Sequence, residues 1–186
     1  MARSGQSGLH AHNGHLKRSA PDDTEVGYQP GRVDVYADFY VAATWNISRV
    51  TRCFLIDLII RIPGIIGDTS ALVKMREAAR CQITGNIASI PYHLSDNIQT
   101  FLHNAHTREA IDPERSAGSL LLMHPLYVLS RISITPRSTR GYLLSCFSWI
   151  GRHMGICQAT VLAQNCDIDV ESITSAWMIL SAALLV

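Results

Sequence analysis

The chain of 186 residues lacks paired cysteines, basic clusters and an apolar segment near its N-terminus. Its five cysteines are widely spaced and form no CxxC pair, which excludes a zinc ribbon and a thioredoxin-like motif. Charged residues make up only 17% of the chain, and lysines and arginines are scattered, so the composition gives no support for a nucleic-acid-binding surface. A signal peptide needs an apolar core that the first residues do not provide. We therefore expect an intracellular protein whose thiols are mostly buried.

Catalytic motifs are missing as well. The sequence contains no phosphate-binding glycine loop, no HExxH and no GxSxG. Ser145, His153 and Asp167 can be combined into a triad on paper, but three common residue types on a helical chain always allow such a combination. We predict that the chain is not an enzyme, has no catalytic, cofactor-binding or metal-binding residues, and uses no cofactor.

Two groups of polar residues have spacings that a metal site could use. They are His10, His12 and His15 near the N-terminus, and His103, His106 and Glu109 in a polar connector. Zinc sites need four ligands on a fixed scaffold, or three ligands in an enclosed pocket. Neither segment offers such a frame, so we expect both groups to be solvated polar surface.

The first 32 residues are rich in Gly, Ser, His, Pro and Asp and contain few large apolar residues. Such a segment cannot bury enough surface to offset the entropy lost on ordering. We predict a disordered tail over residues 1–32 and one helical domain over residues 33–186.

Apolar residues are abundant, at 47%, and recur at helical spacing. The first predicted helix covers residues 33–62, with Arg49 and Arg52 in solvent and Asp57 paired with Arg61 on the surface. The face predicted to be buried consists of Tyr36, Tyr40, Ala43, Ile47, Val50 and Phe54. Its apolar run, CFLIDLIIRI, is too short for a membrane span. Asn46 opens a glycosylation sequon, which we interpret as a chance match.

A second helix is predicted from about residue 69 to Ala88, closed by Ile90 and Pro91. Its apolar face consists of Leu72, Met75, Ala79, Ile83 and Ile87. A polar connector follows over residues 91–116, with a short helical piece around residues 97–102.

The stretch 117–164 is predicted to be the centre of the fold. A helix that starts at Ser116 or Ser119 is apolar on almost every side, and Pro125 is expected either to kink it or to begin a new helical segment after Met123. Thr135 and Pro136 predict the start of the next helix, which we expect to continue to residue 164.

Two stripes are predicted on that helix. They are Leu143, Phe147, Ile150 and Met154, and beside them Cys146, Ile150, His153 and Cys157. Gly151 and Gly155 lie one turn apart and would allow another helix backbone to come close. A last helix is predicted from about residue 169 to the end. The predicted fold class is all-α, an irregular bundle of about five or six helices.

Four segments occur in an order that suggests a family. They are YADFYVAATWNISRVTRCFLIDLIIRI, NIASIPYHL, LLMHPLYVLSRIS and IGRHMGICQATVLA. Together they resemble the C-terminal, all-helical regulatory region of fungal-specific transcription factors of the zinc binuclear cluster class, over roughly residues 36–164. The DNA-binding module of that family holds two zinc ions with six cysteines, and this chain has no matching cysteines. We therefore expect an incomplete regulatory region without its own DNA reader.

The resemblance implies a nuclear, non-catalytic role in transcription regulation or protein interaction. It implies protein partners such as the transcription machinery or a second copy, no direct nucleic-acid or membrane binding, and room for a small-molecule effector. Tyr127, Trp149, Gly151 and Gly155 are expected to be packing residues. Two alternatives stay open. One is a small helical ligand-binding protein or enzyme with a pocket around His124, Tyr127 and His153, and the other is a gene fragment without a function of its own.

Overall fold

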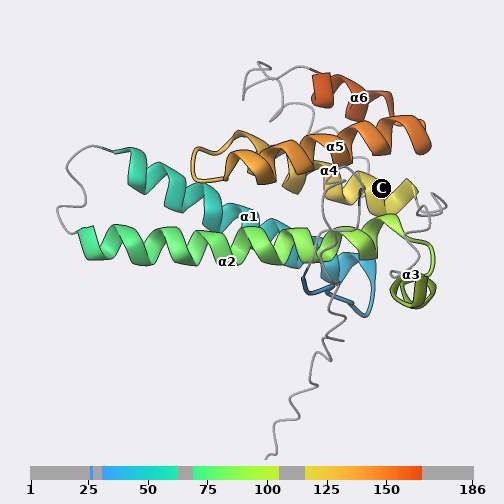
Figure 1. Cartoon of the computed structure of the whole chain (residues 1–186), viewed down its shortest axis with the longest axis horizontal. Helices are drawn as coiled ribbons and strands as arrows, with labels where there is room; N and C mark the ends of the chain where they lie inside the picture. The colour runs from blue at the N-terminus through green and yellow to red at the C-terminus, as the bar shows by residue number, and fades with distance from the viewer. Residues whose placement is uncertain (1–25, 27–30, 63–68, 105–115, 165–186) are drawn as a thin grey trace, which may run out of the picture.

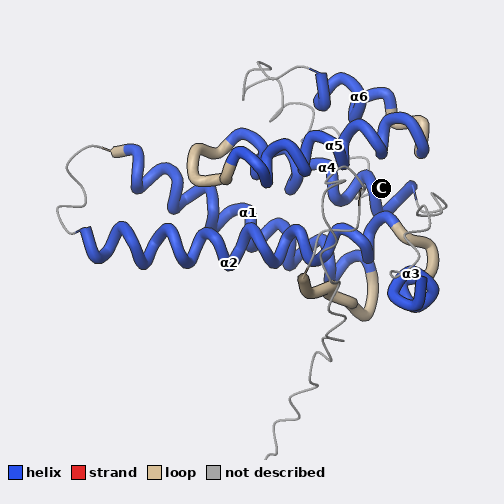
Figure 2. Tube along the Cα trace, viewed as in Figure 1, coloured by secondary structure: helices blue, strands red, loops and turns tan. Residues whose placement is uncertain are grey.

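The protein is described by a computed structural model that covers residues 26, 31–62, 69–104 and 116–164. Within these ranges all regular structure is helical, as Figure 2 shows, which confirms the all-α prediction. The six helices are α1 (Phe39–Arg61), α2 (Thr69–Leu94), α3 (Ile98–Asn104), α4 (Ser116–Arg131), α5 (Arg137–His153) and α6 (Cys157–Gln164).

Helix α4 links the two halves of the fold, since it packs against α1 and α2 on one side and against α5 on the other. Helices α1 and α2 lie side by side and antiparallel, since Cys53 contacts Ala79 while the earlier Asn46 contacts the later Ser89 (Figure 1). Helix α4 packs on both, α5 packs on α4, and α6 covers α5. The short α3 contacts the end of α2.

Helix α4 supplies the centre of the apolar core, as the sequence predicts. Large side chains that are fully buried come mainly from α4, α5 and the C-terminal part of α2: Ile90, Leu94, Leu122, Leu126, Leu129, Leu143, Phe147 and Ile150. The helix is continuous across Pro125. Burying a side chain of this size contributes about 1.5–3 kcal/mol, so a few such neighbours offset the cost of a proline inside a helix.

The predicted tail falls almost entirely outside the described residues, including His10, His12 and His15. Of residues 1–32 the structure describes Val26, Gly31 and Arg32. The boundary at residue 32 stays a prediction.

The first helix begins later than predicted. Residues 33–37 are not helical, and the Asp38 carboxylate caps α1 by accepting from the Val41 amide at 2.8 Å. The non-helical segment is tied to α2, because the Asp34 amide donates to the Ala88 carbonyl oxygen at 2.9 Å. A capping carboxylate that satisfies an otherwise free amide fixes the start of a helix, which is why α1 starts at Phe39.

The predicted buried face of α1 is wrong in part. Tyr40 is 75% exposed, and Ile47 and Phe54 are also exposed. The face that packs inward consists of small and polar residues instead: Ala42, Ala43, Asn46, Val50, Cys53 and Asp57. Periodicity locates apolar stripes but does not say which one faces the core when a helix has apolar residues on two sides.

Asp57 is not the surface residue that the sequence suggests. Its carboxylate is buried and accepts from the Ser133 and Ile134 amides at 2.9 and 3.1 Å, and from the Ser133 hydroxyl at 2.5 Å. Nη1 of the predicted partner Arg61 lies 3.7 Å from Asp57 Oδ2, and the arginine side chain is mostly exposed. Asp57 thus fixes the turn between α4 and α5 to α1.

Helix α2 continues past its predicted end. Its predicted apolar face is buried or half-buried, but the helix runs through Pro91 to Leu94. Ile90 and Leu94 are fully buried on either side of the proline, so their burial outweighs the lost hydrogen bond. The predicted short helix after it is α3, where the Asn97 side chain accepts from the Gln99 and Thr100 amides.

Helix α5 starts one residue after the predicted position, because Pro136 is its N-cap and Thr135 contributes no side-chain cap. It also ends early, at His153. Gly155 follows with φ +68°, a left-handed conformation that glycine adopts without strain, and α6 then folds back. The apolar stripe Leu143, Phe147 and Ile150 is buried as predicted.

The prediction for the two glycines is half correct. A Cβ on Gly151 would lie 2.9 Å from the Thr160 amide nitrogen, so the backbone of α6 does approach Gly151 closely. Gly155 serves the turn, with open space around it. The second predicted stripe is wrong at its C-terminal end, since His153 and Cys157 are exposed. The predicted last helix lies outside the described residues.

Candidate functional site

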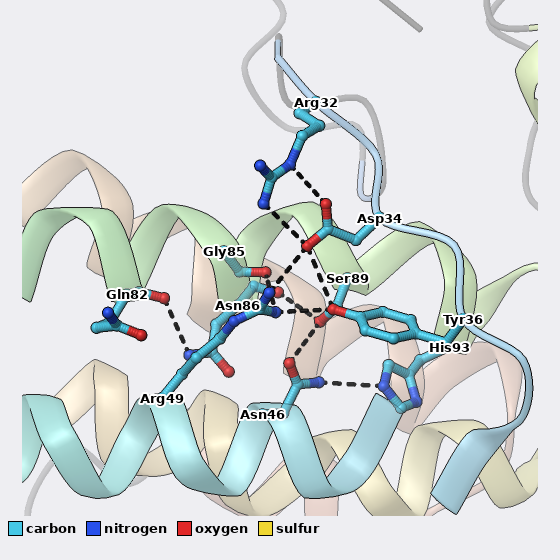
Figure 3. Close-up of polar contacts among 10 residues, drawn as sticks. All are labelled: Arg32, Asp34, Tyr36, Asn46, Arg49, Gln82, Gly85, Asn86, Ser89 and His93. Carbon is cyan, nitrogen blue, oxygen red and sulfur yellow. Dashed lines mark hydrogen bonds and ion pairs between the residues drawn. The ribbon is translucent and has the colours of Figure 1, made fainter. Parts of the chain in front are cut away.

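The most polar part of the interior lies between α1, α2 and the segment before α1 (Figure 3). Two neighbouring groups of polar side chains lie in this space, and we refer to them together as the polar cluster. Its members with side-chain contacts are Arg32, Asp34, Tyr36, Asn46, Arg49, Asn86, Ser89 and His93. Only Arg32 among them is substantially exposed. No pattern in the sequence singles out this set, since its members lie up to 61 positions apart in the chain.

The first group is centred on Asp34. Its carboxylate pairs with Arg49 at 3.1 Å and with Arg32 at 2.6 Å. The Tyr36 hydroxyl donates to the same carboxylate at 3.2 Å and accepts from Arg49 Nη1 at 2.7 Å (Figure 3). Burial of the phenol is the main cause that raises the pKa of Tyr36 to about 12, so its proton stays in place. A buried carboxylate with this many donors is well compensated for lost hydration.

Arg49 reaches this position across the surface of α2. Its Nη1 also donates to the Gly85 carbonyl oxygen at 2.9 Å. A Cβ on Gly85 would lie 2.9 Å from Arg49 Nε, so a side chain there would displace the guanidinium. Gly85, which costs about 0.8–1.0 kcal/mol in a helix interior, thus leaves room for the Arg49 guanidinium beside α2. The sequence prediction that Arg49 stays in water is wrong.

The second group is centred on Asn46. The Ser89 hydroxyl lies 2.7 Å from the Asn86 carbonyl oxygen and 3.0 Å from Asn46 Oδ1, so its one proton is shared between two acceptors. Asn46 Nδ2 lies 3.1 Å from His93 Nε2. With Asn46 Nδ2 as the donor, His93 Nε2 accepts this hydrogen bond. Asn46 is fully buried, which rules out its glycosylation in the folded protein.

His93 is held neutral. Burial lowers its pKa to about 4, and a contact with the Gly118 backbone opposes that shift only weakly. The Phe39 ring stacks on the imidazole with 5.8 Å between centroids. With no exposed surface on His93, Asn46 or Ser89, a substrate has no path to them. The arrangement holds the start of the chain, α1 and α2 together rather than presenting reactive groups.

The structure describes two residues of the possible triad, Ser145 and His153. The Ser145 hydroxyl donates to the Tyr142 carbonyl oxygen at 2.7 Å within α5. His153 is exposed and lies beside Trp149, with ring centroids 5.0 Å apart. Asp167 lies outside the described residues.

The alternative of a pocket around His124, Tyr127 and His153 stays a prediction. Tyr127 is buried, and the Arg131 guanidinium lies 5.9 Å from its ring centroid. His124 is half-buried, and burial lowers its pKa to about 4. Tyr127, Gly151 and Trp149 pack as predicted, Trp149 as a half-buried side chain against the core, whereas Gly155 is exposed.

A small cleft lies elsewhere, where α2 ends and α3 begins. It has a volume of about 320 Å³ and is lined by Tyr92, Ser95, Asp96, Asn97 and Ile98. No pattern in the sequence predicts this cleft, because the segment that lines it carries no motif.

Few of the residues considered as metal ligands, and four of the five cysteines, lie in the described ranges. His103 is exposed on α3, and His106 and Glu109 lie outside the described residues. Across the described ranges, no three His, Cys, Asp or Glu side chains are grouped so as to hold a metal ion. Cys53 and Cys146 are buried, which raises the pKa of each thiol to about 12, whereas Cys81 and Cys157 are exposed.

The fold and the polar cluster thus define an all-helical domain whose first two helices are joined by buried polar contacts. The chain is 39% identical over 163 residues to Transcription factor dbaG of Emericella nidulans. The match covers 87% of this chain and 39% of the relative, so the chain spans about two fifths of that protein's length. It is therefore related to a fungal transcription factor. No family model and no solved structure matches the chain. No described helix is long and apolar enough to cross a membrane.

Proposed function

We propose that this chain is a non-catalytic regulatory domain of the kind found in the C-terminal helical region of fungal zinc binuclear cluster transcription factors, and that it acts in the nucleus through protein contacts. The observation that carries this proposal is the 39% identity to a transcription factor over 163 residues. The sequence has no CxxC pair with which to build the zinc cluster, so contact with DNA is left to another module.

The buried position of the polar cluster supports the non-catalytic part of the proposal. The Ser89 hydroxyl and the His93 imidazole, the groups in it that could serve as nucleophile and base, are both fully buried. A general base has to lie within hydrogen-bond reach of a bound substrate, and both side chains instead contact the buried Asn46.

The experiment is a tethered reporter assay. The full chain is joined to an unrelated DNA-binding module in fungal cells, and transcription from a reporter with the matching DNA site is compared with the module alone. We expect a change in reporter output, and we expect the chain without the module to bind DNA no better than an unrelated neutral protein. An unchanged reporter, or tight DNA binding by the chain with a steep salt dependence, would overturn the proposal.

A second role, binding of a small effector, is favoured by the cleft between α2 and α3. Its volume of about 320 Å³ is near the lower end of the usual range for ligand pockets, and its lining combines an aromatic ring with polar side chains. A thermal-shift screen of small metabolites would identify compounds that raise the melting temperature. Ile98→Trp fills the cleft, so we expect it to abolish the shift. A shift that survives this substitution would exclude the cleft as the binding site.

A chain without a function of its own would not fold cooperatively. Thermal unfolding followed by circular dichroism distinguishes the two cases, and we expect a single cooperative transition.

A further inference from the structure

The cleft between α2 and α3 is formed where the chain turns after the end of α2. Helix α2 ends at Leu94, and the Ser95 amide still donates to the Pro91 carbonyl oxygen at 2.9 Å. The next helix starts almost at once, because the Asn97 side chain accepts from two backbone amides in the first turn of α3. This short turn leaves a space of about 320 Å³ at the end of α2.

A buried hydroxyl group in the wall of this cleft has no hydrogen-bond partner within the described part of the chain. Ser95 lines the cleft and is only 6% exposed, yet its side chain makes no hydrogen bond there. The buried hydroxyls of Ser89 and Ser130 differ, since each lies 2.7 Å from a backbone carbonyl oxygen. A buried polar group without a partner is costly, so a polar group that enters the cleft gains the Ser95 hydroxyl as a partner.

The charge of the lining favours a positively charged ligand. Asp96 contributes a carboxylate, and none of the described residues that line the cleft is basic. The end of α2 acts in the same direction, because the last carbonyl oxygens of a helix carry partial negative charge and have no partner within the helix. The cleft therefore suits a cation that can donate hydrogen bonds better than an anion.

An aromatic ring and an aliphatic side chain complete the wall. Edge contacts with Tyr36 and Phe39, at 5.4 and 5.5 Å between ring centroids, hold the Tyr92 ring in place before any ligand binds. Ile98 is half-buried and packs against the core. Aromatic rings attract organic cations, and apolar walls bind a carbon skeleton. A hard metal ion would need six or more oxygen ligands, so these walls suit an organic cation instead.

We propose that the cleft between α2 and α3 binds a small primary amine, with its ammonium group against Asp96 and the Ser95 hydroxyl and its apolar body against Tyr92 and Ile98. The proposal rests on the small-effector role proposed above and names the chemical class of that effector. An ammonium group has three donors, which match the Asp96 carboxylate, Ser95 Oγ and a carbonyl oxygen at the end of α2. The volume of the cleft suits a compound of the size of phenethylamine.

Calorimetric titration of the full chain with phenethylamine tests the proposal. Two further probes carry the same ring on a short chain: phenethyl alcohol, which is neutral, and phenylacetate, which is an anion. We expect saturable binding of phenethylamine and at least about tenfold weaker binding of phenethyl alcohol, because the charge-assisted hydrogen bond is lost. No binding of phenylacetate is expected at millimolar concentrations.

Two variants separate the role of the charge from that of the hydroxyl group. Asp96→Asn keeps the shape of the side chain and should weaken phenethylamine binding by at least about tenfold. Ser95→Ala should weaken it about threefold, and it removes no hydrogen bond of the folded chain. Glu77→Gln is the matched control for charge, since this carboxylate is 65% exposed about four turns before Tyr92, and we expect it to leave the affinity unchanged.

Equal affinity for the amine and the alcohol, tighter binding of phenylacetate, or equal losses from Asp96→Asn and Glu77→Gln would overturn the proposal. Absence of phenethylamine binding at millimolar concentrations would overturn it as well. The effector role fails separately from the choice of ligand. A neutral or acidic compound whose thermal shift is lost in Ile98→Trp would keep the cleft as an effector site and overturn its preference for amines.

Discussion

The contact between α1 and α2 and the contact between α4 and α5 are built on opposite principles. Between α4 and α5 the contact is apolar, with fully buried side chains such as Leu129, Leu143 and Phe147. Between α1 and α2 small and polar residues meet, and the polar cluster joins them. An apolar contact accepts many substitutions of similar volume, whereas a polar one works only if every partner is present. We therefore expect stability to depend on side-chain volume in the α4–α5 contact and on the presence of each polar partner in the α1–α2 contact.

The largest effect is expected from Phe147→Ala in the apolar contact. Phe147 is fully buried, and removing its ring leaves a cavity that costs about 3–5 kcal/mol of the free energy of unfolding. Urea denaturation measures the loss. Val161→Ala, at an exposed position of α6, should change that free energy by no more than about 0.5 kcal/mol. Similar losses for both would show that the α4–α5 contact is not the centre of the core.

Arg49→Met tests the polar contact. It leaves the buried Asp34 carboxylate without the more buried of its two cations, and the expected loss is about 2–4 kcal/mol, the upper values being reduced because Arg32 remains paired with it. The matched control is Arg52→Met, three residues further along α1, where the side chain is exposed and a change within about 0.5 kcal/mol is expected. Equal effects would mean that the ion pair adds no net stability.

Acid is expected to weaken the polar contact through His93. Its pKa is about 4 in the folded chain and about 6.5 when unfolded, so the unfolded state binds the proton first. Stability is full above about pH 6.5 and falls as the pH drops toward 4, with a loss of about 2 kcal/mol from this residue at pH 5. Urea denaturation of His93→Gln at pH 7 and pH 5 should show a smaller difference than the wild type.

The control for the pH experiment is His103→Gln, which removes an exposed histidine on α3. We expect it to keep the wild-type dependence on pH. His124, whose pKa burial also lowers to about 4, remains in both variants and contributes equally to them. A pH dependence in His93→Gln that equals the wild type's would mean that His93 is not neutral in the folded chain.

The smallest effect on the free energy of unfolding is expected from Gly85→Ala, and its sign should depend on whether Arg49 is present. Gly85→Ala in the wild type displaces Arg49 and is expected to cost about 1–2 kcal/mol, a hydrogen bond to a charged group less the gain in helix propensity. With Arg49→Ala already present, the same change should stabilise the protein by roughly 0.8–1 kcal/mol. A double-mutant cycle by urea denaturation measures both. Destabilisation in both backgrounds would show that something other than Arg49 requires the glycine.

Several features of the fold could be predicted from the sequence because they depend on local properties. The sequence located the segments of α1 to α4 and predicted one helix where the structure has α5 and α6, which are divided at Gly155. The start of α1 and the end of α2 differ from the prediction. The central place of α4 followed from a segment that is apolar on nearly every side. The exposed position of Arg52 followed from the same periodicity that misplaced Arg49. The two arginines differ only in what lies beside them in space.

The sequence by itself determined where the chain is helical and which helix lies at the centre, since backbone preference and apolar periodicity act over a few residues. The tertiary structure alone decided which of the two apolar faces of α1 turns inward. It also decided that Asp34, Arg49, Asn46 and His93 meet. These contacts join residues 15 to 47 positions apart, and only the antiparallel packing of α1 on α2, with the preceding segment laid across them, brings the charged and polar groups close enough to replace the water that each one loses.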